Sequence, residues 1–170
     1  MGAGYYMGSI YAEQSKFKEA LDCANVDVEL GFPKAKPLAA HLELKEFEGH
    51  PLKNVAKAQD LLKGVDLSTA GLVGDPLTFY YQTLCDVSSA LAGRGMYRPA
   101  IEGFNKVIEA KDNCAFETYA KAANNQGMLY AKGGGVSKNI QFALAYFALV
   151  GDLDAIKDEK LLYGPAIYNL

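Results

Sequence analysis

Three consecutive glycines form the part of this sequence that is most similar to a phosphate-binding loop. The segment GGGVSK spans residues 133–138. A P-loop surrounds a phosphate with backbone N–H groups, and it requires a preceding strand and the spacing GxxxxGK[ST]. Here a helical pattern precedes the glycines, and no glycine stands directly before Lys138. We therefore interpret the glycines as a turn between two helices, where positive φ is useful, with Ser137 or Asn139 capping the second helix.

Other side chains with potential chemistry do not form a recognisable catalytic arrangement. The serines within helical patterns, such as Ser9, have no histidine spaced as in a Ser-His-Asp triad. Three carboxylates that could serve as acids or bases are expected on a solvated helix surface: Glu43, Glu46 and Glu48. The GxG at residues 93–95 has neither a preceding strand nor a third glycine. We therefore predict no catalytic residues and no enzymatic activity.

Cysteine and histidine are too few and too widely spaced for a structural metal site. The cysteines are Cys23, Cys85 and Cys114, and the histidines are His41 and His50. No pair has the CxxC spacing, and HExxH is absent. We predict no metal, no cofactor and no disulfide, with the cysteines acting as small buried hydrophobic residues.

Composition predicts one globular domain. The 170 residues are 50% hydrophobic and 22% charged, which is enough for a substantial core. A net charge of −3 argues against a nucleic-acid binder, which usually carries a basic stripe. No apolar run is long enough for a membrane span, and the first residues lack the basic region of a secretory signal. We therefore expect a cytoplasmic protein that does not bind nucleic acid and has no membrane span.

The elements that must position any site are four similar helical pairs. The second helix of each pair centres on an alanine, with hydrophobic residues mostly at spacings of three, four and seven that mark one helix face. These anchors are Ala20, Ala58, Ala100 and Ala143. The preceding helix of each pair carries a residue at one matching position, which is small except in the second pair: Gly8, Leu42, Ser88 and Gly127. The seventh position after the anchor is valine except in the first copy, which has Asp27.

These residues carry a resemblance to a known family of helical repeats. The segments YMGSIYAEQSKFKEALDCANVDVELGFP and LAGRGMYRPAIEGFNKVIEA resemble tetratricopeptide repeats. AANNQGMLYAKGGGVSKNIQFALAYFALVG resembles the related Sel-one-like repeat, with its longer glycine-rich turn. AAHLELKEFEGHPLKNVAKAQDLLKGV is a weaker copy, because Leu42 and Lys45 replace the usual Gly and Tyr. The repeats span about 2–33, 35–66, 79–112 and 118–151, followed by an expected terminal helix at 158–169.

The resemblance implies an all-α fold, a right-handed superhelical solenoid of antiparallel helix pairs. In this family the first helix of each pair lines a concave groove, and some members hold a partner's carboxylate with Lys and Asn. Lys121 and Asn124 are the candidates for that role here. The partner-binding residues expected along the groove are Tyr5, Ser9, Lys36, Glu43, Gln82, Ser89, Lys121, Asn124 and Met128.

The resulting functional hypothesis is a non-enzymatic scaffold or adaptor that binds a peptide or a partner protein in the groove. The alternative is a repeat domain that regulates or targets an enzyme, or a small-molecule sensor of the same helical build. Single-stranded RNA recognition by helical repeats needs a basic groove, and the acidic balance argues against it. An uncapped repeat end would expose apolar surface and permit self-association.

Overall fold

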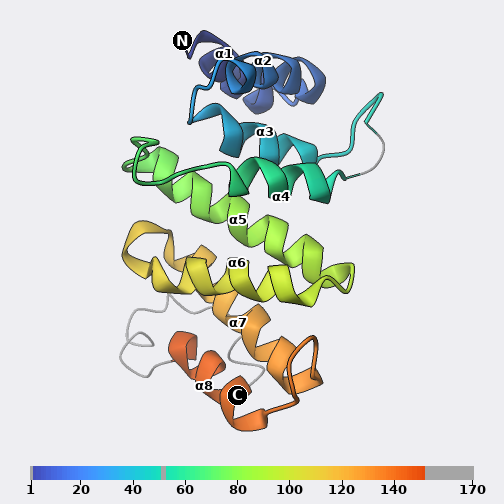
Figure 1. The fold of residues 1–170 in the computed structure, drawn as a ribbon, viewed down its shortest axis with the longest axis vertical. Coiled ribbons are helices and arrows are strands. Elements are labelled where there is room, and N and C mark those ends of the chain that lie inside the picture. Colours follow the sequence, from blue (N-terminus) through green and yellow to red (C-terminus); the bar gives the residue numbers. More distant parts are fainter. Residues whose placement is uncertain (1, 51–52, 152–170) are drawn as a thin grey trace. The chain divides into compact units, whose positions relative to one another are not determined.

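The structure is a computed structural model that describes residues 2–50 and 53–151. This part of the chain forms eight α-helices and one short 3₁₀ turn at Lys111–Asn113 (Figure 1). The helices are α1 (Ala3–Glu13), α2 (Phe17–Glu29), α3 (Ala35–Glu43), α4 (Val55–Lys63), α5 (Asp75–Gly93), α6 (Tyr97–Glu109), α7 (Phe116–Lys132) and α8 (Ile140–Gly151). The described residues contain no strand, only an isolated bridge between Phe47 and His50. The all-α prediction is confirmed, and the terminal helix predicted at 158–169 lies outside the described residues.

The chain divides into two compact units, residues 1–83 and 84–170, with the boundary inside α5. In the first unit α1 packs against α2, α2 against α3 and α3 against α4, and α1 also touches α3. In the second unit α6 packs on α7, and α7 packs on α8. The eight helices expected within the four repeats are present, in the expected order.

The four anchor alanines are buried, as the repeat pattern predicts. Two helices cross closely beside Ala20 and beside Ala143, and the glycine of the partner helix at each crossing has no room for a side chain. A Cβ added to Gly8 would lie 3.0 Å from the carbonyl oxygen of Ala20. A Cβ added to Gly127 would overlap the ring of Phe147. The small residues therefore allow the two helices of these pairs to approach each other closely.

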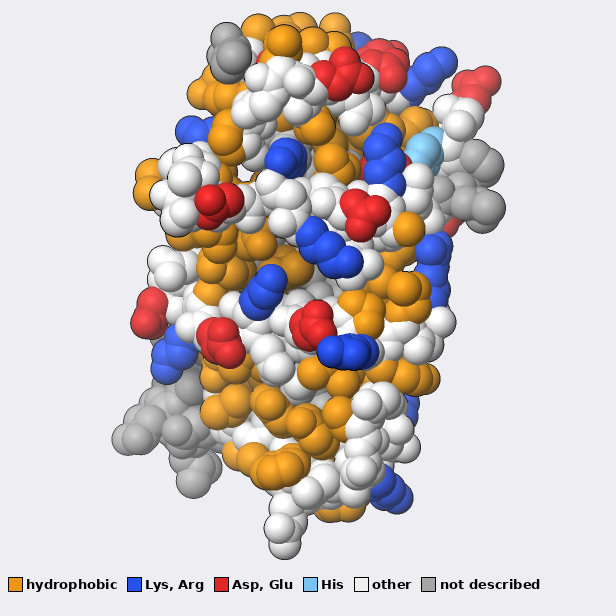
Figure 2. Space-filling model, viewed as in Figure 1, with side chains coloured by type: hydrophobic (Ala, Val, Ile, Leu, Met, Phe, Trp, Pro, Cys, Tyr) orange, Lys and Arg blue, Asp and Glu red, His pale blue; other side chains and the backbone are white. Residues whose placement is uncertain are grey.

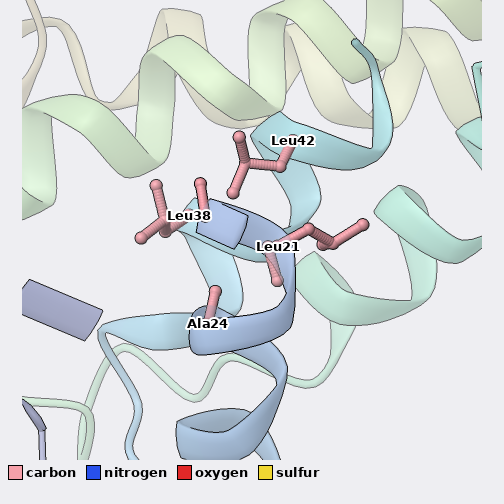
Figure 3. Packing of buried hydrophobic residues seen from close by; sticks show 6 residues of the cluster. Leu21, Ala24, Leu38 and Leu42 are labelled. Atoms are coloured by element: carbon pink, nitrogen blue, oxygen red, sulfur yellow. The ribbon is translucent and has the colours of Figure 1, made fainter. Parts of the chain in front are cut away.

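The second pair departs from this rule because Leu42 occupies the small position. Leu42 is fully buried and belongs to a cluster with Leu21 and Ala24 of α2 and Leu38 of α3 (Figure 3). A large residue fits there because it fills space between α2 and α3. The irregular position of the weaker repeat is thus part of the core.

Asp27, the exception in the valine pattern, caps the first helix. Its carboxylate is buried and accepts hydrogen bonds from the backbone N–H groups of Gly2 at 3.3 Å and Tyr5 at 2.7 Å. Gly2 is the N-cap residue of α1, and it has no side chain that could accept these hydrogen bonds itself. The negative charge also suits the positive end of the helix dipole. A polar residue therefore replaces valine because its carboxylate accepts hydrogen bonds from the backbone N–H groups at the start of α1.

Candidate functional site

The candidate partner surface in the second unit lies on α5 and α7. The Asp86 carboxylate is 2.7 Å from the Lys121 ammonium, and the Asn125 amide donates to the Ser89 hydroxyl at 3.1 Å. Both contacts advance in the same direction along the two helices, so α5 and α7 run parallel. We call the surface formed by these four half-exposed residues and Met128 the α5–α7 face.

Asn124 does not belong to an accessible groove, which corrects the expectation from the sequence. Its side chain is buried, whereas Lys121 is partly exposed and engages Asp86. The two residues are one turn apart, but only Lys121 lies at the surface. They therefore do not form the expected Lys-Asn pair for a carboxylate. Met128 and Ser89 remain partly accessible.

Cys85 lies beneath this face, and its burial argues against a role as a nucleophile. Burial raises the pKa of its thiol to about 12, although the nearby Lys121 lowers it slightly. The sulfur lies 3.8 Å from the carbonyl oxygen of Thr118. Because the thiolate is the reactive form, this cysteine is a packing residue at neutral pH.

The other expected groove residues lie in the first unit, and several of them form hydrogen bonds within that unit. The Ser9 hydroxyl donates to the carbonyl oxygen of Tyr5 at 3.0 Å, and burial raises the pKa of Tyr5. The Lys36 ammonium donates to the carbonyl oxygen of Gly64 at 2.5 Å and so ties α3 to the end of α4. Gln82 is exposed on α5. Tyr5, Ser9 and Lys36 are each partly exposed.

Glu43 is neither a groove residue nor a surface carboxylate, in contrast to both expectations. Its exposed fraction is 1%, whereas Glu46 and Glu48 are exposed as predicted. The Glu43 carboxylate lies 2.9 Å from His50 Nε2 and 2.6 Å from the Lys57 ammonium. The two cationic or polar partners compensate for the burial of the charge.

The Glu43–His50–Lys57 cluster joins α3, the following loop and α4. His50 Nδ1 lies 3.2 Å from the carbonyl oxygen of Lys45, so both ring nitrogens of His50 face acceptor oxygens. The loop is held further because Asn54 donates its N–H to the Glu43 carbonyl oxygen at 2.8 Å. Both ring nitrogens of His50 are thus engaged within the protein, and the cluster ties the loop to α3 and α4.

Sequence reasoning missed this cluster because its members are separated by a loop without periodicity. One signal was present: Glu43 is the single carboxylate of the segment AKPLAAHLE, which is otherwise apolar or basic. A lone acid at the end of an otherwise buried helix indicates a partner elsewhere in the chain.

The glycine segment is a turn, as the sequence predicts. Gly133 ends α7 with φ 78°, and the N–H groups of Gly133 and Gly134 both donate to the carbonyl oxygen of Leu129, at 2.9 and 2.8 Å. These N–H groups are used within the protein and do not surround an anion. Asn139 caps α8 through a hydrogen bond from the N–H of Phe142 at 3.0 Å.

Gly135→Ala should lower the free energy of unfolding by about 1–2 kcal/mol, because left-handed backbone is unfavourable for residues with a Cβ. Gly135 has φ 72°, and a Cβ there would overlap the side chain of Tyr97. The control is Gly93→Ala, where a Cβ meets open space at a helical φ and stability should be unchanged or slightly higher. Urea unfolding measures both variants. A melting shift with ATP that Lys138→Ala abolishes would contradict the turn interpretation.

No protein-family model matches the chain, and no curated protein or solved structure is significantly similar to it. Among the described residues, no helix is both long and apolar enough to cross a membrane. The same part of the chain contains no group of three or more His, Cys, Asp or Glu residues that could hold a metal ion.

Proposed function

We propose that the chain is a tetratricopeptide- or Sel-one-like right-handed solenoid that acts as a non-enzymatic scaffold for a peptide or partner protein. The supporting observation is the parallel packing of α5 and α7, with α6 between them in the chain. In a solenoid of helix pairs, the first helices of successive repeats run parallel and form one continuous surface. The resemblance of the four repeats adds to this support.

The partner would bind across the α5–α7 face. This face offers hydrogen-bond donors and acceptors, together with the partly exposed thioether of Met128. The charges of Asp86 and Lys121 offset each other, so recognition would depend on shape and hydrogen bonding more than on net charge. A bound polypeptide segment fits this chemistry, and its affinity should depend weakly on salt.

A photo-crosslinking amino acid at position 128 tests the proposal. We expect it to capture a partner from the native cell lysate that an identical group at position 106 does not capture. Lys106 is the matched control, because it is exposed on α6. Mass spectrometry then identifies the captured protein. Equal capture at both positions, or none at position 128, would contradict a partner site on the α5–α7 face.

The proposed compartment is the cytoplasm. Cys23, Cys85 and Cys114 are all free. Free cysteines are typical of proteins in reducing compartments. Imaging of the tagged full-length protein tests this location.

A further inference from the structure

His50 has an acceptor oxygen opposite each of its two ring nitrogens. Nε2 lies 2.9 Å from Oε2 of Glu43, and Nδ1 lies 3.2 Å from the carbonyl oxygen of Lys45. A backbone carbonyl and an ionised carboxylate accept hydrogen bonds but donate none. A neutral imidazole carries one N–H group, whereas the imidazolium carries two. Only the protonated ring can therefore donate to both oxygens at the same time.

Lys57 favours the ionised form of the Glu43 carboxylate. Its ammonium lies 2.6 Å from Oε1 of Glu43, while His50 faces Oε2 of the same group. A positive charge at this distance stabilises the charged form of a carboxyl group. The hydrogen in the contact between Glu43 and His50 therefore belongs to the histidine.

The other charged groups around His50 act on it more weakly. The remaining charged side chains of the loop are exposed or partly exposed, so that water and salt screen them: Lys45, Glu46, Glu48 and Lys53. Helix α2 contributes the uncharged ring of Phe17, whose centroid lies 6.4 Å from that of Phe47. Glu43 of α3 and Lys57 of α4 are thus the main charges beside His50.

The ring of His50 is also part of the turn formed by residues 45–50. The N–H of His50 donates to the carbonyl oxygen of Phe47 at 2.8 Å, and the N–H of Phe47 donates to that of His50 at 3.1 Å. The two rings are stacked, with centroids 4.8 Å apart. The His50 side chain is 18% exposed, and Figure 2 shows histidine atoms at the surface next to those of Lys or Arg. Protons from the solvent can therefore reach a ring that holds the turn.

We propose that protonation of His50 fixes the turn at residues 45–50 to the end of α3, and that deprotonation weakens this turn. The neutral ring keeps its one N–H on Nε2, because a hydrogen bond to a carboxylate is stronger than one to a carbonyl. Nδ1 then presents a lone pair to the carbonyl oxygen of Lys45, and that contact is lost. The turn is in the first unit, and the proposal does not depend on a partner of the α5–α7 face.

The direction of the pH dependence follows from this contact. Histidine changes its charge between about pH 5 and 8. Protonation and formation of the complete turn favour each other, since only the imidazolium satisfies both oxygens. The contribution of His50 to the turn is therefore fully present at low pH and is lost as the pH rises through the titration of the ring.

Nitrogen-15 NMR of the histidine rings in the full-length protein tests the protonation step. The chain has two histidines, so the spectrum of His50→Gln assigns the His50 signals. We expect His50 to keep both ring protons at a pH at which the same residue in the urea-unfolded chain has lost one. At higher pH the remaining proton should be on Nε2. Titration at the same pH in the folded and unfolded chains, or a remaining proton on Nδ1, would overturn the proposal.

Solvent exchange of the backbone N–H groups of Phe47 and His50 tests the turn itself. After correction for the intrinsic rates, we expect their protection to be about tenfold greater near the lower end of the histidine range than near its upper end. The N–H of Gly134 is the internal control, because it is also hydrogen-bonded within a turn and the second unit contains no histidine. Its protection should not change. Equal protection of the Phe47 and His50 groups at both pH values would contradict the proposal.

Two matched variants assign the effect to one histidine. His50→Gln retains a hydrogen-bond donor but does not titrate, so the tenfold change should disappear. His41→Gln replaces the other histidine of the chain and should retain the change. A change that survives His50→Gln would mean that a different group controls the turn. Circular dichroism checks that both variants fold, and the ring titration of the parent protein decides the question if His50→Gln does not.

Discussion

Phe104→Ala should lower the free energy of unfolding by about 3–5 kcal/mol. Phe104 lies on α6, one turn after the anchor Ala100, and its side chain is fully buried. The substitution removes a large apolar group from the core and leaves a cavity that the surrounding helices fill only in part. The total free energy of unfolding of a typical domain is about 5–15 kcal/mol, so the variant should retain only part of its stability.

Phe142→Ala is the matched control for this prediction. Phe142 lies on α8 and is exposed, and its ring contacts Tyr130 edge-on at 5.4 Å. Loss of this one aromatic contact should cost at most about 1.5 kcal/mol. Urea unfolding, followed by circular dichroism at low protein concentration, measures both variants. Equal losses for the two phenylalanines would mean that α6 does not direct Phe104 into the core.

Removing both partners of Glu43 should have the second large effect. In the variant His50→Ala/Lys57→Ala, the carboxylate of Glu43 stays buried without a cation. An uncompensated buried charge costs about 3–5 kcal/mol. Because the Lys57 side chain is 48% exposed, water can partly replace its ammonium group. We therefore expect the loss in the free energy of unfolding to lie near the lower end of this range.

Adding Glu43→Met to the same variant should restore most of the lost stability. Methionine fills a similar volume and needs no partner, so the cost of the unpaired charge disappears. The control Lys63→Ala, at an exposed position at the end of α4, should change the free energy of unfolding by less than about 0.5 kcal/mol. If the double variant unfolds at the same urea concentration as the parent, Glu43 is hydrated and the cluster does not hold the loop.

Sequence periodicity predicted the helices because burial of one helix face requires apolar residues at spacings of three and four. The anchor alanines and the glycine positions followed from the same pattern, since close crossings exclude side chains. The glycine turn was predictable too, because a positive φ angle favours glycine strongly enough to be read from residue type alone. These features are local or repeat regularly, and each repeat supports the next.

The fate of the polar residues depended on the tertiary structure. Glu43 and Asn124 were expected at an accessible groove and are buried, whereas Asp27 broke the valine pattern because it caps α1. Periodicity identifies which helix face is apolar, but it does not say which distant group will compensate a buried polar side chain. That compensation is set by the distances between helices, such as the 2.7 Å between the Asp27 carboxylate and the N–H of Tyr5. The sequence alone therefore determined where the helices lie and which faces pack, and only their packing decided which polar groups are buried and which remain available to a partner.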